Sequence, residues 1–379
     1  MSKPKLLFIL NVAKRVNNFS ESSMLAARSL GFDFHIAGNW SYESDLARQA
    51  DEELYGIKIH QIDFIRAPYS PGNVKAYRQL KELVAREKYD FIHCNTPIGG
   101  VLGRIVGKKY KVKKVIYQVH GFHFYNGAPL LNWILYYPIE KLLSRITDTL
   151  ITINKDDFEF AKKKIKLRRG GNVLYVPGVG IDTKEFSSNA EIRSLKRAEL
   201  NISDDDLVLI SSGNLDKNKN FETAIKAVAL QKRKNVKLFI CGSGSELENL
   251  TTLIENLGVE DRVKLLGYRS DMKELLCASD AFILPSFREG LSRSIMEAMA
   301  SGLPCIVSKI RGNVDLIDDG IGGFLCSPCD VTAFSEAIEQ LAESMELREA
   351  MSRINLEKIK LFDLATATDE MTKIYSTLE

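Results

Sequence analysis

Residues 281–307 read AFILPSFREGLSRSIMEAMASGLPCIV and contain one complete strand–helix–strand unit. Ala281–Leu284 and Cys305–Val307 are short apolar runs, which is typical of strands that are buried on both faces. Between them, Ser294–Ala300 has the pattern of a short helix. A helical connection of this kind joins strands that run parallel. The stretch therefore predicts a parallel sheet with helices packed on its faces.

The same alternation of apolar runs and helical patterns extends over nearly all 379 residues. It pauses once, at Pro177–Gly180 and the polar segment Asp182–Asp206, and then begins again. The sequence therefore predicts an α/β protein with two Rossmann-like parallel-sheet domains that face each other across a cleft. We expect an N-terminal domain over residues 1–180, a C-terminal domain over 181–360, and a helix over 361–379 that crosses back to the N-terminal domain. The expected strands are Leu6–Val12, Phe32–Ala37, Lys58–Ile62, Phe91–Cys94, Lys114–Gln118, Thr149–Ile153 and Val173–Val176, then Leu207–Ser211, Val236–Cys241, Val263–Leu266, Ala281–Leu284 and Cys305–Val307.

The composition is that of an ordinary globular protein, with 45% hydrophobic and 27% charged residues. No apolar run approaches the roughly 18 residues of a membrane-spanning helix. The six cysteines are scattered, as in reduced cytosolic proteins. Cys326 and Cys329 form a C-x-x-C without a second pair, so we interpret them as part of a loop and not as a zinc site. These patterns predict a cytoplasmic protein.

Charge is distributed unevenly along the chain. Residues 1–185 carry 29 Lys and Arg against 18 Asp and Glu, whereas the remainder carries 23 against 31. Lysine clusters at 108–114 and 162–169 flank the apolar and aromatic stretch Leu130–Pro138. Lysines are attracted to anionic membrane surfaces and aromatic side chains favour the headgroup level. We therefore expect the first domain to contact an anionic membrane peripherally; solvated charge and a core helix are the alternative. Nucleic acid is not expected, because no base-stacking motif accompanies the lysines.

Two glutamates flank the expected helix start in the quoted stretch. Leu291 and Ser292 lead into a helix whose free N–H groups favour an anion such as a phosphate. Glu289 precedes this turn and Glu297 lies about one helical turn inside. A carboxylate at either position can accept hydrogen bonds from sugar hydroxyls. The pair is suited to a sugar nucleotide, with one acid for each sugar; two solvated surface glutamates are the alternative.

A second loop in the same domain, residues 212–220, follows an expected strand and precedes an expected helix. Gly213 permits a tight turn, and Lys217 and Lys219 can reach a diphosphate at the helix N-terminus. A solvated lysine loop is the other interpretation. The Gly-x-Gly at Gly242 and Gly244 is weak support, because it also serves as an ordinary turn.

Together these motifs resemble the retaining glycosyltransferases of family 4, which have the GT-B fold and an E-x7-E signature, here Glu289 and Glu297. The resemblance covers the whole chain. Its other motifs are the diphosphate loop Gly213…Lys219, the base-proximal segment Gly267–Asp271, the strand Asp280–Ser286 and the histidine motif Gln118–His123.

The resemblance implies a role for several positions. Glu297 is expected to bind the nucleotide ribose, Glu289 the donor sugar and Lys219 the diphosphate. His120 is expected beside the donor sugar, so the implied catalytic pair is His120 and Glu289. Asn214 stands where the family usually has an arginine, which leaves more charge neutralisation to Lys219, with help from Arg293. The implied donor-binding set is Gly213, Lys219, Arg269, Gly290, Leu291, Ser292, Arg293 and Glu297.

The first domain offers candidate acceptor-binding residues. His120 follows the apolar strand Val115–Val119, where a side chain reaches the ligand edge of a parallel sheet. His123 lies three residues further on, and a structural role is the alternative for either histidine. The loop Asn11–Phe19 contains no glycine, so we interpret it as a basic, acceptor-facing loop with Lys14 and Asn17 as candidates.

The sequence thus predicts a retaining glycosyltransferase that moves a sugar from a nucleotide sugar, a UDP-sugar, to a saccharide acceptor. By resemblance to capsule and exopolysaccharide enzymes, the acceptor is linked to undecaprenyl diphosphate at the inner face of the cell membrane. No cofactor and no metal is expected, and Asp204–Asp206 is interpreted as a turn. Two alternatives remain: a sugar-nucleotide 2-epimerase of the same fold, and a binding protein that keeps the nucleotide site without chemistry.

Overall fold

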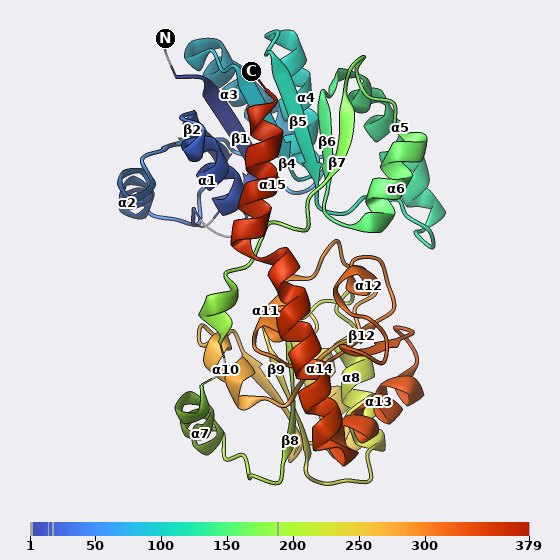
Figure 1. Ribbon diagram of the computed structural model, residues 1–379. Coiled ribbons are helices and arrows are strands. Elements are labelled where there is room, and N and C mark those ends of the chain that lie inside the picture. The colour runs from blue at the N-terminus through green and yellow to red at the C-terminus, as the bar shows by residue number, and fades with distance from the viewer. Residues whose placement is uncertain (1–2, 14, 17–18, 188, 379) are drawn as a thin grey trace. The chain divides into compact units, whose positions relative to one another are not determined.

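The computed structural model describes residues 3–13, 15–16, 19–187 and 189–378. The chain forms two compact units (Figure 1). One unit contains Met1–Gly180 together with Leu364–Glu379, and the other contains Ile181–Asp363. Each unit has its own parallel sheet and its own hydrophobic core, as the two series of apolar runs predict.

Seven parallel strands form the sheet of the first unit among the described residues, in the order β3-β2-β1-β4-β5-β6-β7. β1 pairs with both β2 and β4, so the strand order reverses beside it. Ligands of such sheets bind at this reversal, beyond the carboxyl ends of the strands. The elements are β1 Lys5–Val12, α1 Glu21–Ser29, β2 Asp33–Asn39, α2 Asp45–Tyr55, β3 Lys58–Gln61, α3 Gly72–Glu87, β4 Phe91–Asn95, α4 Pro97–Lys109, β5 Lys114–Val119, α5 Leu130–Leu143, the 3₁₀ helix η1 Ser144–Ile146, β6 Thr149–Thr152, α6 Lys155–Lys164, β7 Asn172–Tyr175 and α15 Leu364–Ser376.

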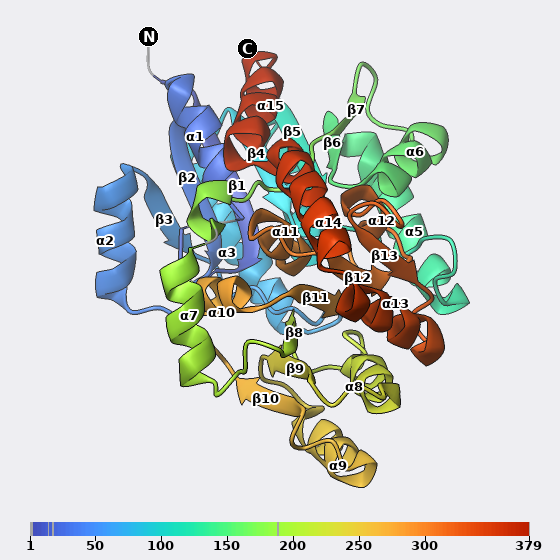
Figure 2. The same ribbon diagram turned by 60° about the horizontal axis from the view of Figure 1, so that its bottom comes forward.

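The second unit has six parallel strands in its described part, in the order β10-β9-β8-β11-β12-β13. Here the order reverses between β8 and β11, which are hydrogen-bonded neighbours. Helix α8 lies between α9 and α13 beside this sheet (Figure 2). The elements are η2 Thr183–Phe186, α7 Ala190–Glu199, β8 Leu207–Ser212, α8 Phe221–Leu230, β9 Val236–Cys241, α9 Leu247–Leu257, β10 Val263–Gly267, α10 Met272–Ala278, β11 Ala281–Leu284, α11 Arg293–Ala300, β12 Cys305–Ser308, α12 Asn313–Leu316, β13 Gly323–Cys326, α13 Val331–Glu343, α14 Met345–Lys358 and η3 Ile359–Phe362.

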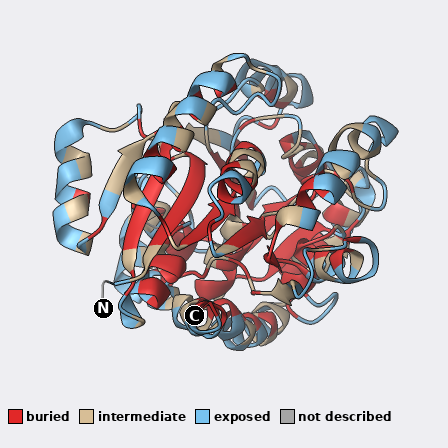
Figure 3. Ribbon diagram, turned by 90° about the horizontal axis from the view of Figure 1, so that it is seen from above, coloured by how far each residue is buried: buried red, intermediate tan, exposed pale blue. Residues whose placement is uncertain are grey.

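The strands are the most buried parts of both units, as Figure 3 shows in red. In β11 and β12 every residue is buried, which is why these strands read as unbroken apolar runs. Helix α15 packs on α1, and its Met371, Ile374 and Tyr375 belong to the core formed with β1 and β2. The last helix of the chain therefore completes the core of the first unit.

Sequence reasoning missed or misread several elements. The polar segment Asp182–Asp206 contains η2 and α7, because α7 buries charged Arg197 where an apolar stripe would have given the usual signal. Cys326 ends strand β13 and is buried, whereas Cys329 is exposed in the turn that follows. Asp204 and Asp205 lie in a turn, as expected. Among the described residues, no helix is both long and apolar enough to cross a membrane.

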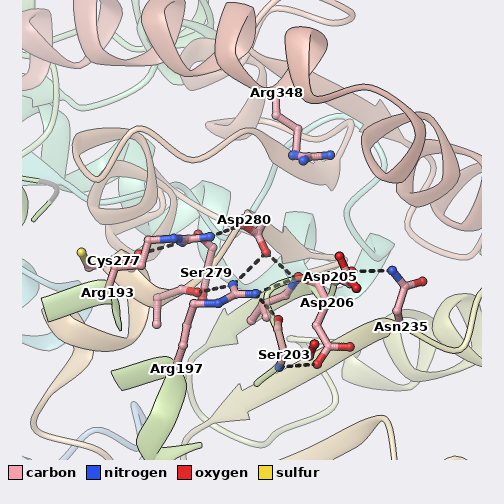
Figure 4. A network of polar contacts seen from close by, with 12 residues as sticks. Arg193, Arg197, Ser203, Asp205, Asp206, Asn235, Cys277, Ser279, Asp280 and Arg348 are labelled. Atoms are coloured by element: carbon pink, nitrogen blue, oxygen red, sulfur yellow. Dashed lines mark hydrogen bonds and ion pairs between the residues drawn. The ribbon is translucent and has the colours of Figure 1, made fainter. Parts of the chain in front are cut away.

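A cluster of polar contacts anchors the start of β11 (Figure 4). The Asp280 carboxylate accepts hydrogen bonds from Arg193 and Arg197 of α7, and also from the backbone N–H of Val208 at 2.7 Å. Arg197 is 6% exposed. Charge-assisted bonds of this kind are stronger than neutral ones, so α7 fixes the strand that leads into the loop with Glu289.

Candidate functional site

Two of the predicted donor-binding side chains meet in the second unit. Lys219 lies in the loop after β8, and Glu289 lies in the loop after β11. Because these strands are neighbours, their loops leave the same edge of the sheet. Lys219 Nζ lies 2.7 Å from Glu289 Oε1, and the two side chains are 17% and 12% exposed. They form a mostly buried ion pair whose groups can both be offered to a ligand.

Two asparagines that the sequence analysis did not single out join these loops. The backbone N–H of Phe287 donates to the carbonyl of Asn218 at 2.8 Å, and Asn218 Nδ2 donates to the carbonyl of Arg288 at 3.0 Å. Asn220 Nδ2 donates to the carbonyls of Pro285 and Pro328. Asn220 has φ 53°, a conformation that asparagine tolerates better than most residues. The sequence pattern that could have indicated these two asparagines is Asn-Lys-Asn at 218–220.

Helix α11 begins at the predicted turn. Ser292 is its N-cap, with extended backbone and no side-chain capping bond, so the first N–H groups remain available to an anion. Glu297 Oε1 accepts from Arg293 Nε at 2.8 Å, one helical turn away. Burial raises the pKa of Glu297, and the neighbouring Arg293 cation opposes that rise. A second carboxylate–cation pair therefore lies on the helix that follows Glu289.

Glycines bring the loops of this unit into close approach. A Cβ atom on Gly312, which has φ 81°, would lie 2.3 Å from the carbonyl oxygen of Gly290. A Cβ atom on Gly242 would lie 1.9 Å from the carbonyl oxygen of Gly213. Real Cβ atoms do not approach so closely, so the backbone around Gly290 and Gly213 is held by contacts that only glycine permits.

Arg269, another predicted donor-binding residue, already has partners. Its guanidinium donates to both oxygens of Asp271 and contacts Glu199, while Lys196 also binds Asp271. Its hydrogen bonds to Asp271 raise the pKa of Arg269 further. The carboxylates of Asp271 and Glu199 therefore compensate this cation, and its role in donor binding stays a prediction.

His120 follows β5 at the carboxyl edge of the first sheet, as predicted. Its Nε2 lies 3.0 Å from Asn95 Oδ1, and the ring of Phe19 packs on it at 4.1 Å between centroids. Burial lowers the pKa of His120 to about 3. The imidazole is therefore neutral at physiological pH.

A cavity of about 260 Å³ adjoins His120 within the first unit. His123 lines it too, and its ring packs against Tyr136 at 4.7 Å. Glu140, which also lines it, forms a buried ion pair with Arg104, whose guanidinium lies over the Tyr117 ring. The remaining wall is mainly aromatic and aliphatic: Tyr69, Ile98, Val101, Val119, Phe122, Phe124 and Ile139.

The two other acceptor candidates, Lys14 and Asn17, lie outside the described residues. The neighbouring Arg15 is paired with Asp51 at 2.9 Å, so its charge is held within the unit. Across the described part of the chain, no group of three or more His, Cys, Asp or Glu side chains is arranged to hold a metal ion.

The second unit thus combines a helix N-terminus, a lysine and two carboxylates at a strand-order reversal, an arrangement that fits a phosphorylated sugar. Two protein-family models also match this chain. A family model described as "Glycosyl transferases group 1" matches residues 192–357, and one described as "Glycosyl transferase 4-like" matches residues 8–154.

Relatives and solved structures match over nearly the full length. EpsD of Bacillus subtilis (strain 168), a protein named as a glycosyltransferase, is 36% identical and the match covers 98% of this chain and 96% of EpsD. An Escherichia coli protein named "UDP-Gal:alpha-D-GlcNAc-diphosphoundecaprenol alpha-1,3-galactosyltransferase" is 28% identical over 83% of this chain and 84% of its own. HepE of Anabaena, solved in complex with UDP and glucose, superposes with a TM-score of 0.81 at 20% identity, covering 99% of this chain and 100% of that one.

The chain belongs to the glycosyltransferase family that these models and relatives define. It is a transferase of the GT-B fold, with two Rossmann-like parallel-sheet domains. The predicted glycosyltransferase family and the two parallel-sheet domains are confirmed, whereas retention of configuration and the role of the E-x7-E signature stay predictions.

Proposed function

We propose that this glycosyltransferase moves a sugar, with retention of anomeric configuration, from a UDP-sugar to a saccharide carried on a polyprenyl diphosphate, in the assembly of a bacterial polysaccharide. The Lys219–Glu289 ion pair is the observation that carries the donor half of the proposal. The Escherichia coli relative is named for a UDP-sugar donor and a diphosphoundecaprenol acceptor, which supports the two substrate classes. A Staphylococcus aureus relative, 25% identical, is named for capsular polysaccharide biosynthesis.

The donor opens the ion pair when it binds. Its diphosphate takes Lys219 as a counter-ion and accepts hydrogen bonds from the first N–H groups of α11. Glu289 then loses its cation and accepts hydrogen bonds from the donor sugar. Glu297, held by Arg293, accepts from the ribose hydroxyls. The diphosphate therefore replaces Glu289 as the partner of Lys219.

The transfer step needs no covalent intermediate. The acceptor hydroxyl attacks the anomeric carbon on the face from which the diphosphate departs. The bond from that carbon to the phosphate oxygen breaks, and the hydroxyl proton passes to the departing diphosphate. Lys219 and the helix N-terminus stabilise the negative charge that grows there. No metal or other cofactor takes part in the proposed reaction, because Lys219 and the N-terminus of α11 supply the positive charge.

The acceptor's lipid places the first unit at the inner face of the cell membrane. Helix α5 carries four aliphatic side chains that are 60% exposed or more: Leu130, Leu131, Ile134 and Leu142. Trp133 of the same helix packs inside instead, against Phe124 and Phe160. We therefore assign membrane contact to the aliphatic face of α5, with the basic ends of α4 and α6 attracted to anionic lipid.

Liposome binding tests the membrane assignment. The double variant Leu131→Ser, Ile134→Ser is expected to lose most co-sedimentation with anionic vesicles at low salt. Leu195→Ser, which removes a similarly exposed leucine from α7 of the second unit, is the matched control and should bind as the wild type does. Equal binding by all three proteins would refute a role for α5.

The transfer itself is tested by NMR on the purified protein with a panel of UDP-sugars, with and without a polyprenyl-diphosphate saccharide. Free UDP and a new glycosidic signal of the donor's own anomeric configuration are expected only with acceptor present. A sugar that changes configuration while still attached to UDP would make the protein a 2-epimerase. Binding of the UDP-sugar without any conversion would make it a binding protein.

A further inference from the structure

Asn95, which the sequence analysis did not single out, contacts the predicted catalytic histidine. It is the last residue of β4, and it lies beside Gln118 of β5 in the parallel register. His120 follows two residues later, so both side chains lie at the carboxyl edge of neighbouring strands. Asn95 is 0% exposed, and its Oδ1 lies 3.0 Å from His120 Nε2. This is a buried polar contact at the ligand edge of the sheet.

The turn that holds Asn95 is itself firmly fixed. Thr96 has φ 63° and ψ 158°, a backbone conformation that is costly for a β-branched residue. Strain of this kind persists only where the surroundings enforce it, and it is concentrated at functional sites. The backbone N–H of Gly99 donates to Asn11 Oδ1 at 2.6 Å, which ties the start of α4 to β1. Asn95 is therefore presented from a rigid, strained corner.

The contact selects one form of the imidazole ring. A neutral imidazole carries one N–H, and an amide oxygen can only accept a hydrogen bond. With Oδ1 of Asn95 facing the ring, Nε2 would hold the proton and Nδ1 would carry a free lone pair. Among the described residues, His120 Nδ1 has no hydrogen-bond partner, and His120 lines the 260 Å³ cavity. The lone pair on Nδ1 is thus not taken up by any residue that the structure describes.

We propose that Asn95 is a positioning residue that holds His120 as the Nε2–H tautomer and directs Nδ1 to accept a hydrogen bond from a sugar hydroxyl. The inference rests on the proposed function, because it assigns the ligand to a saccharide. His120 orients this hydroxyl and does not remove its proton, since the buried ring is a weak base. Asn95 acts only through His120. Asn95 Nδ2 is buried and has no hydrogen-bond partner among the described residues.

Nitrogen-15 NMR of the histidine side chains tests the tautomer without any turnover. The protein has five histidines, and His120 is assigned by its disappearance in His120→Gln. We expect a protonated Nε2 and an unprotonated Nδ1 near neutral pH in the wild type. The opposite tautomer would overturn the proposal, because Asn95 would then be donating its Nδ2 hydrogen to the ring.

Two variants test the positioning role. Asn95→Leu removes the acceptor at similar volume, and we expect kcat to fall about 10- to 100-fold, as for the loss of one hydrogen bond to an essential group, while the donor KM stays unchanged. Asn95→Asp keeps an acceptor oxygen and should retain the tautomer and more of kcat than Asn95→Leu. Unchanged kcat in folded Asn95→Leu would overturn the proposal. If Asn95→Leu fails to fold, the wild-type spectrum and the Asn95→Asp variant still show whether Asn95 sets the tautomer of His120.

The outcomes separate this inference from the proposed function. If no UDP-sugar is transferred by the wild type, the transferase proposal fails while the NMR spectrum still reports whether Asn95 sets the tautomer. If transfer occurs and the ring carries its proton on Nδ1, the transferase proposal holds and the positioning role of Asn95 fails.

Discussion

The side chains that are proposed to contact substrate differ in charge between the two units. In the second unit, Lys219 with Glu289 and Arg293 with Glu297 are held as ion pairs within the protein. In the first unit, His120 is neutral and is held by the uncharged Asn95. The difference follows the chemistry of the proposed substrates. A diphosphate exchanges one set of ionic contacts for another, whereas a saccharide hydroxyl needs only a fixed hydrogen-bond acceptor.

The largest effect is expected for Glu289→Gln, which removes the carboxylate of the Lys219–Glu289 ion pair in the second unit. The amide cannot replace the carboxylate toward the donor sugar, so kcat should fall about 10²-fold or more in a donor-turnover assay. Glu222→Gln is the matched control, because it breaks the exposed Glu222–Lys226 pair on α8 of the same unit. Full turnover by Glu289→Gln would remove this residue from the reaction.

Glu297→Gln should have a smaller effect, confined to donor binding. The variant replaces a charge-assisted hydrogen bond by a neutral one, so we expect the donor KM to rise about 10-fold with little change in kcat. Steady-state kinetics with varied donor measures both. A fall in kcat at unchanged KM would instead place Glu297 at the reacting centre.

Gly312→Ala tests whether the loop backbone is as important as its charges. The new Cβ atom would clash with the Gly290 carbonyl, so the turn before α11 must shift and the donor KM should rise several-fold. Gly320→Ala is a sharp control: Gly320 also has a positive φ, but a Cβ atom there meets no other atom within 4 Å. Equal donor affinity in both variants would show that the Gly312–Gly290 contact does not matter.

The last prediction concerns acid stability, which should separate the two units. All five histidines lie in the first unit, and burial lowers the pKa of His60 to about 4 and of His93 to about 3. A folded-state pKa below the unfolded value of about 6.5 means that stability is present above pH 6.5 and is lost as the pH falls. Through His93 alone, the free energy of unfolding should fall by about 2 kcal/mol between pH 6.5 and 5.

Hydrogen exchange followed by mass spectrometry checks this separately for each unit. Peptides of residues 3–180 should lose protection between pH 7 and 5, after correction for intrinsic rates, while those of 189–363 should change less. His60→Asn, at the edge strand β3, should reduce the loss in the first unit. Equal acid sensitivity of both units would contradict the assignment to histidine.

The fold was largely readable from the sequence, because strands buried on both faces leave unbroken apolar runs such as Ala281–Leu284. Glu289 and Glu297 were readable too, since their spacing about a helix start is a local pattern. The Lys219–Glu289 contact was not, because it joins residues 70 positions apart through neighbouring strands. Asn95 was missed for a similar reason: nothing in its own segment indicates that β4 and β5 are adjacent. Helix α7 was not predicted, because its buried face includes an arginine.

The position of α15 has a consequence for synthesis of the protein. Met371, Ile374 and Tyr375 complete the core of the first unit, yet the ribosome makes them only after all of residues 181–363. At ordinary elongation rates this interval lasts on the order of 10 to 40 s. During that time the surface of α1 that α15 covers is exposed while the second unit can already fold. The nascent first unit therefore exposes part of its core until α15 has been made.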